Sequence, residues 1–218
     1  METTARSDKP KTLQTIAYVS IPESADLEFL LWDLQDAIAA YARLSGTALP
    51  RPVDLNANDA VAADGIVLAV EDMPDDEAMP AAQCALDRFG NTGTRVYVVV
   101  QAACERTEGA RMLVERLRQA CELRRLTWCG GVVVCADSGI AALRHSPRMG
   151  LLRRPFSEAM DKLVGAVRMG CSVEHAQQLG GDAGGVTADG MVCARPALSA
   201  PIWRAIIKRL GTRAQSNS

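Results

Sequence analysis

The chain has 218 residues and a mass of 23.3 kDa, which suits one medium-sized domain with a full hydrophobic core. Hydrophobic residues make up 48% and charged residues 23%, a composition that excludes disorder over most of the length. No uncharged apolar run of about 18 residues occurs, so we expect no transmembrane helix and no membrane partner. The first fourteen residues are polar, which argues against a signal peptide, and we expect a cytoplasmic location.

The net charge of −2 gives no reason to expect a nucleic-acid partner, but the charges are unevenly distributed. Residues 1–110 carry 18 acidic and 8 basic side chains, whereas residues 111–218 carry 8 acidic and 16 basic ones. Such a division arises from solvated helix faces or from complementary docking between subunits. The densest basic cluster, at residues 144–154, could hold a dinucleotide phosphate or form a solvated or subunit-facing surface.

The seven cysteines include no CxxC pair, and only two histidines accompany them. This pattern predicts neither a disulfide framework nor a zinc site, and we expect no bound metal. Most of the thiols are interpreted as small buried hydrophobic side chains. Cys104 is the best candidate for a reactive thiol, because we expect it at a junction of strand and helix, where a helix N-terminus can lower a thiol pKa.

Strand and helix patterns alternate along the chain. Apolar runs predict strands at 14–20, 65–70, 95–101 and 131–136, with a weak edge strand at 53–55. Apolar residues at helical spacing predict helices at 27–44, 80–89, 108–124 and 155–170, and one that begins at Pro201. Ser24 suits the N-cap of the first helix, and Gly46 suits its end. The alternation predicts an α/β fold in which helices cover both faces of a doubly wound, five-stranded parallel sheet.

In such folds ligands bind outside the carboxyl ends of the strands. Four loops therefore deserve inspection, at residues 20–25, 71–79, 102–109 and 137–153.

Several short motifs lie in these loops and around them. They are Ser20-Ile21-Pro22-Glu23-Ser24, Met79-Pro80 with Leu86-Asp87-Arg88-Phe89, Ala102-Ala103-Cys104-Glu105, Trp128-Cys129-Gly130-Gly131, Gly150-Leu151-Leu152-Arg153-Arg154-Pro155 and Pro201-Ile202-Trp203. Their order over residues 14–210 resembles that of the flavodoxin-like NAD(P)H-dependent FMN reductase family.

The resemblance implies the flavodoxin-like strand order 2-1-3-4-5 and an oxidoreductase that passes reducing equivalents from NAD(P)H through FMN to a small-molecule or protein acceptor. The flavin would do the redox chemistry, so no side chain need act as an acid or a base. Residues after the first strand would hold the phosphate, and those after the next two central strands would flank the flavin ring. The residues that would hold the phosphate are Ser20, Ile21, Pro22 and Ser24. Those that would flank the flavin ring are Glu71, Asp72, Met73, Ala102, Ala103, Cys104 and Glu105.

We expect the chain to divide into five segments. They are a disordered arm at residues 1–13, a flavodoxin-like domain at 14–176, a Gly-rich irregular segment at 177–200, an amphipathic helix at 201–211 and a disordered tail at 212–218. The apolar stripe of the terminal helix either packs on its own domain or covers a neighbour in a two-fold dimer. Flavodoxin-like reductases commonly form such dimers, and we expect a homodimer.

Acidic residues in the expected phosphate and ring loops support a different hypothesis. Glu23 lies in the first loop, and Asp26 and Glu28 follow it. Each carboxylate within about 4 Å of a phosphate costs on the order of 1 kcal/mol even in water. The segment 71–77 adds five acidic residues. The alternative is therefore a flavodoxin-like domain that no longer binds flavin and acts as a binding or assembly protein.

Overall fold

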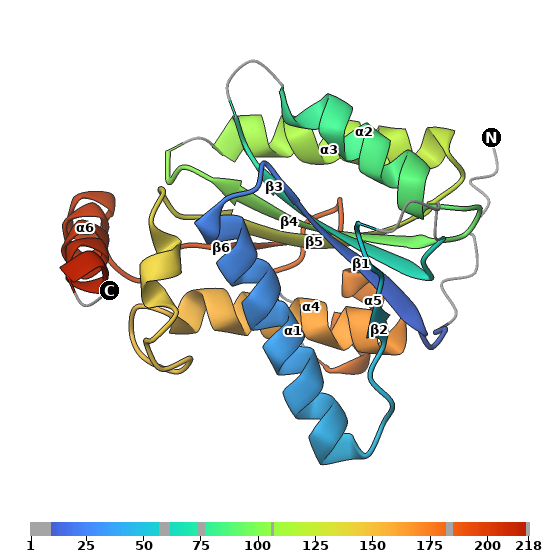
Figure 1. The fold of residues 1–218 in the computed structure, drawn as a ribbon, viewed down its shortest axis with the longest axis horizontal. Helices are drawn as coiled ribbons and strands as arrows, with labels where there is room; N and C mark the ends of the chain where they lie inside the picture. The colour runs from blue at the N-terminus through green and yellow to red at the C-terminus, as the bar shows by residue number, and fades with distance from the viewer. Residues whose placement is uncertain (1–9, 57–61, 74–76, 106, 182–184, 217–218) are drawn as a thin grey trace.

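The computed structural model describes residues 10–56, 62–73, 77–105, 107–181 and 185–216. Within them, one sheet of parallel strands has the order β2-β1-β3-β4-β5-β6 (Figure 1). The strands are β1 (Thr15–Ile21), β2 (Arg51–Pro52), β3 (Gly65–Glu71), β4 (Arg95–Ala102), β5 (Thr127–Cys135) and β6 (Met191–Ala194). The helices are α1 (Ala25–Ser45), α2 (Ala78–Phe89), α3 (Thr107–Leu123), η2 (Ile140–Leu143), α4 (Arg154–Met169), α5 (Val173–Leu179) and α6 (Ala200–Ser216).

The strand order confirms the α/β, flavodoxin-like fold class, with the predicted 2-1-3-4-5 order in its first five strands. The prediction of only five strands is wrong, because β6 adds a sixth, parallel to β5, from Met191 beside Gly131 to Ala194 beside Val134. This strand lies in the segment 177–200 that the sequence predicts as irregular. Four residues are too few to display a strand period among the surrounding glycines. The edge strand β2 is also shifted, to Arg51–Pro52 instead of 53–55.

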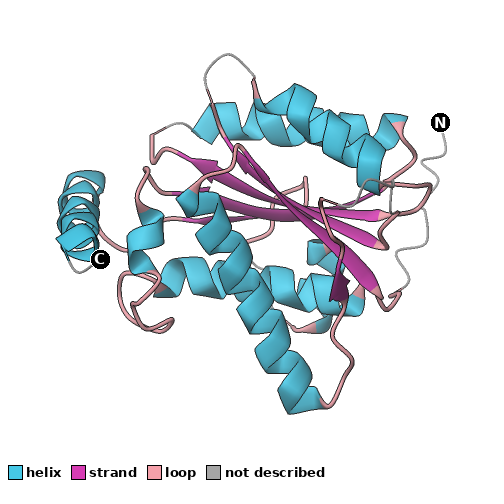
Figure 2. Cartoon of the chain, viewed as in Figure 1, coloured by secondary structure: helices cyan, strands magenta, loops and turns pink. Residues whose placement is uncertain are grey.

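Helices cover both faces of the sheet (Figure 2). Helices α1, α4 and α5 lie on one face, and α2 and α3 lie on the other (Figure 1). The central strands β3 and β4 are buried along nearly their whole length, because both of their faces are covered. Alternate residues of β3 therefore contribute to different cores. Val67 and Ala69 lie in the core under α1 and α4. Ile66 and Leu68 lie in the core under α2 and α3.

The two predicted ends of α1 are confirmed. The Ser24 hydroxyl accepts a hydrogen bond from the Leu27 N–H at 3.3 Å, which satisfies one of the free donors of the first turn. Gly46 ends the helix in the left-handed conformation at a φ of 66°. These ends fix where the loop after β1 stops and the helix starts.

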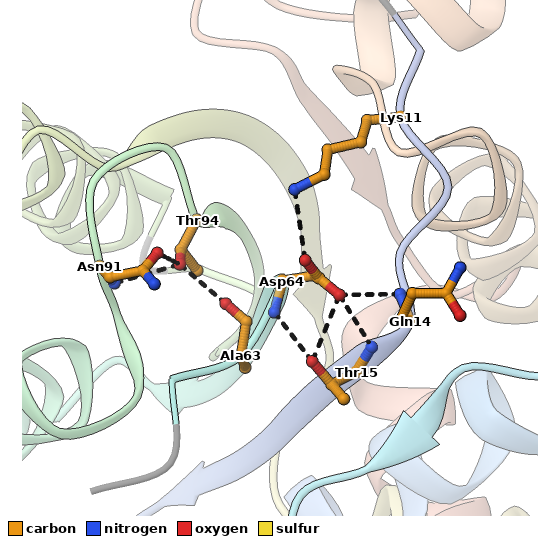
Figure 3. Close-up of polar contacts among 7 residues, drawn as sticks. All are labelled: Lys11, Gln14, Thr15, Ala63, Asp64, Asn91 and Thr94. Atoms are coloured by element: carbon orange, nitrogen blue, oxygen red, sulfur yellow. Dashed lines mark hydrogen bonds and ion pairs between the residues drawn. The ribbon is translucent and has the colours of Figure 1, made fainter.

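A hydrogen-bonded network joins loops at the amino edge of the sheet (Figure 3). The Asp64 carboxylate accepts from the Gln14 N–H at 2.9 Å, from the Thr15 N–H at 3.2 Å and from Lys11 Nζ at 3.2 Å. Beside it, the Thr94 hydroxyl donates to the Ala63 carbonyl at 2.8 Å. These contacts join the segment before β1 to the segments that precede β3 and β4. The polar groups at this edge therefore stabilise the fold.

The terminal helix α6 lies beyond the edge of the sheet, next to η2 (Figure 1). It is longer than the predicted 201–211 and reaches into the tail that the sequence predicts as disordered. Trp203 and Ile207 are buried, and the Trp203 ring lies 5.5 Å from the Phe156 ring. The stripe therefore packs at least partly on its own domain. No helix among the described residues is long and apolar enough to cross a bilayer.

The segments that the sequence predicts as disordered, and the acidic loop after β3, belong only in part to the described residues. Residues 1–9, 74–76 and 217–218 lie outside the described residues. Leu13, at the end of the predicted arm, is buried in the core under α1, so the ordered domain begins before residue 14.

Candidate functional site

A cleft of about 330 Å³ opens at the carboxyl edge of the sheet, between the ends of β3, β4 and β5. This is the position at which a doubly wound sheet is expected to bind a ligand. The lining residues are mostly acidic or small: Glu71, Asp72, Met73, Gln101, Ala102, Ala103, Ala136, Asp137 and Ser138. The cleft thus presents oxygen atoms and small side chains, and no aromatic ring, to an incoming group.

The loop between β1 and α1 is only three residues long, from Pro22 to Ser24. The Ser24 hydroxyl already accepts from Leu27, and the exposed Glu23 carboxylate stands beside it in the chain. Phosphate binding at a helix start needs unengaged N–H groups and close backbone approach. Pro22 has no N–H group, and the loop contains no glycine to let a phosphate approach the backbone closely.

The Asp26 carboxylate, in the first turn of α1, holds the start of η2. One of its oxygens accepts from the Gly139 N–H at 2.7 Å and from Gln101 Nε2 at 3.2 Å, and the other accepts from the Ala141 N–H at 2.8 Å. An intrachain carboxylate thereby takes the donors that an external anion would use. The remaining amide oxygen of Gln101 is buried and has no partner among the described residues.

The start of α3 is also faced by a carboxylate of the chain. A Cβ atom added to Gly109 would lie 2.6 Å from the Asp72 side-chain oxygen, so the absence of a side chain at Gly109 is what lets that carboxylate approach. Asp72 itself is anchored by its N–H, which donates to the Gln101 carbonyl at 2.8 Å. Three helix starts at this edge are therefore faced by groups of the protein itself.

Arg204 brings α6 to the same edge. Its guanidinium donates to Asp137 at 2.7 Å and to Glu105 at 3.1 Å. Asp137 lines the cleft and also accepts from the Cys104 N–H at 3.4 Å. The Arg204 guanidinium is thus engaged with two carboxylates of its own chain.

Cys104 does not have the lowered pKa that the sequence predicts. Burial is the largest influence and raises the pKa of this thiol above its ordinary value, and the Asp137 charge raises it further. The Cys104 thiol donates to the Cys135 carbonyl at 3.2 Å. The expected lowering of the Cys104 pKa by a helix N-terminus is therefore not found.

The structure brings some of the predicted site residues together and separates others. Five of the eleven line the cleft: Glu71, Asp72, Met73, Ala102 and Ala103. Cys104 and Glu105 follow in the next loop, where Arg204 engages Glu105, and the residues after β1 do not line the cleft, namely Ser20, Ile21, Pro22 and Ser24. The prediction misses Gln101, Ala136, Asp137 and Ser138, although the last two belong to a loop that the strand pattern singles out.

The basic cluster at 144–154 has a structural role. Arg153 is buried, pairs with the buried Asp33 carboxylate and donates to the Ser146 carbonyl at 2.9 Å. Arg148 joins Asp33 at 3.0 Å and Asp161 at 2.8 Å. These ion pairs fasten the loop before α4 to α1, and they leave two of the four arginines of the cluster engaged within the fold.

Comparison with known proteins assigns no family. No family model matches the chain, and no curated protein matches it. Among solved structures, a Streptococcus pneumonia TIGR4 flavodoxin matches at 14% identity and a TM-score of 0.42, over 67% of this chain and 97% of that one. The solution structure of two-electron reduced Megasphaera elsdenii flavodoxin matches at 15% identity and a TM-score of 0.37, over 68% and 98%. The assignment of the fold rests on the strand order described above.

Proposed function

We propose that the chain is a flavodoxin-like binding domain that does not use flavin and that takes a cationic, hydrogen-bond-donating group in the carboxyl-edge cleft. The observation that carries this proposal is that the helix starts at this edge are faced by the chain's own side chains, Ser24 at α1, Asp26 at η2 and Asp72 at α3. A phosphate at the start of η2 or α3 would have to displace the Asp26 or Asp72 carboxylate.

The wall of the cleft favours a cation. Glu71 contributes a carboxylate, and Gln101 contributes an amide oxygen without a partner among the described residues. Asp72 and Asp137 add negative charge to the wall, although groups of the chain engage both of them. Carboxylates in a partly enclosed space attract a positive group more strongly than they would in bulk water. An ammonium or guanidinium group has the donors and the charge that such a wall lacks.

The residues at this edge do not fit FMN phosphate. A phosphate at the start of α1 would meet the nearby carboxylates of Glu23, Asp26 and Glu28. The repulsion adds on the order of 1 kcal/mol for each carboxylate within about 4 Å in water, and more where water is excluded.

Two titrations test the proposal. Purified protein should be colourless, and at tens of micromolar it should leave the fluorescence of free FMN unchanged. Spermidine, used as a probe cation in calorimetry, should bind, and Glu71→Gln should weaken it about fivefold, the effect of losing roughly 1 kcal/mol of attraction. Glu174→Gln, at an exposed position on α5, is the matched control and should bind spermidine as the unaltered chain does. Equal affinity in both variants would refute the cationic assignment.

A second function, the FMN-dependent oxidoreductase, is favoured by one observation. Five residues that the resemblance assigns to the flavin ring share one cleft of about 330 Å³, including Met73 and Ala103. Such an enzyme would take reducing equivalents from NAD(P)H and pass them to a small-molecule or protein acceptor. A yellow protein that quenches added FMN and oxidises NADPH would establish it. Replacing Glu23 by Ser and Glu71 by Thr should then tighten FMN about tenfold for each 1.4 kcal/mol of repulsion removed.

A further inference from the structure

Two thiols on neighbouring strands lie within reach of each other. The sulfur of Cys135, at the end of β5, and the sulfur of Cys193, on β6, are 3.5 Å apart. Cys193 pairs with Val133 in the parallel ladder, so Cys135 is its diagonal neighbour two residues further on. Both side chains point to the α2–α3 side of the sheet, because Val132, Val134 and Val192 fill the core on the opposite side.

The two thiols differ in exposure and in charge environment. Cys135 is buried, whereas Cys193 is exposed, since it lies on the edge strand. A hydrogen bond from Cys135 and the neighbouring Arg195 guanidinium lower the pKa of the Cys193 thiol to about 6, against the opposing effect of burial. The same pairing raises the pKa of Cys135. One thiol is therefore suited to attack as a thiolate, and the other stays protonated beside it.

We propose that Cys193 and Cys135 form a reactive dithiol, in which Cys193 is oxidised by hydroperoxides and Cys135 resolves the product as a disulfide. The two thiols lie on the α2–α3 side of β5 and β6, and Cys135 directly precedes the cleft residues Ala136 and Asp137. The proposed reaction does not depend on what the cleft binds, so it can be tested separately.

The reaction balances with a hydroperoxide as the oxidant. The Cys193 thiolate attacks the outer peroxide oxygen, so a sulfur–oxygen bond forms and the oxygen–oxygen bond breaks. The leaving alkoxide takes a proton from solvent and departs as an alcohol, or as water when hydrogen peroxide reacts. Cys135 then loses its proton and attacks the Cys193 sulfenic acid, which forms the disulfide and releases water. Two thiols are oxidised and one peroxide is reduced.

Disulfide formation requires the edge strand to shift toward β5, because diagonal neighbours in a sheet are about 7–8 Å apart and a disulfide joins Cα atoms less than about 7 Å apart. The sulfurs must approach from 3.5 Å to about 2.05 Å. Cys193 lies on β6, a four-residue strand at the edge of the sheet. Among the described strands, β6 pairs with β5 alone. Such a strand can shift more easily than a central one.

Peptide mapping of the full chain tests the proposal. After treatment with one equivalent of hydrogen peroxide at pH 7, we expect two of the seven thiols to be lost and a linked peptide pair containing Cys135 and Cys193. Dithiothreitol should restore both thiols. In Cys135→Ser, the Cys193 sulfenic acid should persist and be trapped by dimedone, which also shows that Cys193 is the residue attacked.

The alkylation rate of Cys193 provides a second test of the proposal. Iodoacetamide at pH 7 should label Cys193 about tenfold faster than Cys84, the other exposed thiol, because the lowered pKa of Cys193 makes it mostly thiolate. Arg195→Gln should remove much of that advantage, and Cys84→Ser should leave peroxide oxidation unchanged. Absence of the Cys135–Cys193 linkage in the unaltered chain, or labelling of Cys193 no faster than that of Cys84, overturns the proposal.

Discussion

Asp33 is a carboxylate on the core-facing side of α1, among buried apolar residues of that helix. It is buried, and its partners Arg153 and Arg148 come from the loop more than a hundred residues later. We expect Asp33→Asn to lower the free energy of unfolding by about 3–5 kcal/mol, because Arg153 would stay buried without a counter-charge. Urea unfolding followed by circular dichroism measures the change. Arg154→Ala, which breaks an exposed pair with Glu158, should cost less than about 1 kcal/mol, and an equal loss would contradict the argument.

Asp64, at the amino edge, gives a pH dependence with a defined sign. Burial alone would raise its pKa, but hydrogen bonds from Gln14, Lys11 and Thr15 outweigh burial, so the pKa lies below its ordinary value of 3.8. A carboxyl with a lowered folded-state pKa stabilises the fold above the unfolded-state pKa, and that stabilisation disappears as the pH falls through the folded-state value. The stability difference between the unaltered chain and Asp64→Asn should be constant near neutral pH and should shrink below about pH 4. Urea midpoints from pH 2 to 7 would show a flat difference if this carboxylate is not involved.

At the scale of helices and strands, the pairing of β5 with β4 requires a glycine at position 131. This residue belongs to the Trp128-Cys129-Gly130-Gly131 motif. A Cβ atom on Gly131 would lie 1.9 Å from the Val98 carbonyl oxygen of β4, so the two strands could not pair as they do. We expect Gly131→Ala to lower the free energy of unfolding by at least about 2 kcal/mol. Gly165→Ala, in α4, meets nothing within 4 Å and should instead stabilise the fold by up to about 1 kcal/mol. Thermal unfolding of both variants gives the comparison, and a neutral Gly131→Ala would refute the close-approach argument.

Elements with a local signal could be predicted from the sequence, and contacts between distant residues could not. Ser24 and Gly46 mark the ends of α1 because capping is decided within a few residues. The strand β6 has no such signal in four residues. The hydrogen bond that the Gly139 N–H donates to Asp26 joins positions 113 residues apart, so no local rule reveals that this acid engages the start of η2. The position of the cleft was predictable because parallel strands end at one edge, but its acceptor-rich wall depends on Gln101 and Asp137, which only the fold brings together.

At the scale of the whole molecule, α6 divides its apolar stripe between its own domain and solvent. Trp203 is buried against Phe156, whereas Ile202 is 53% exposed. We expect Trp203→Ala to lower the free energy of unfolding by about 3–5 kcal/mol, which thermal or urea unfolding measures.

The exposed part of the stripe is left for a partner, so we expect the chain to be a homodimer. Ile202→Glu should shift it to monomer without changing the free energy of unfolding of the monomer. Light scattering at low salt measures the mass. A monomeric unaltered chain at high concentration would contradict the dimer.

The parallel order of the sheet has a consequence for how the chain avoids aggregation as it is made. During synthesis β5 emerges from the ribosome well before β6, and its nine residues then present an unpaired outer row of N–H and C=O groups. Such a row is a template for strand addition by another nascent chain. The short β6 covers part of it, and an edge of four residues offers much less to a second molecule than one of nine. Chains terminated before Met191 should therefore accumulate as insoluble oligomers, whereas chains that reach Ala194 should not.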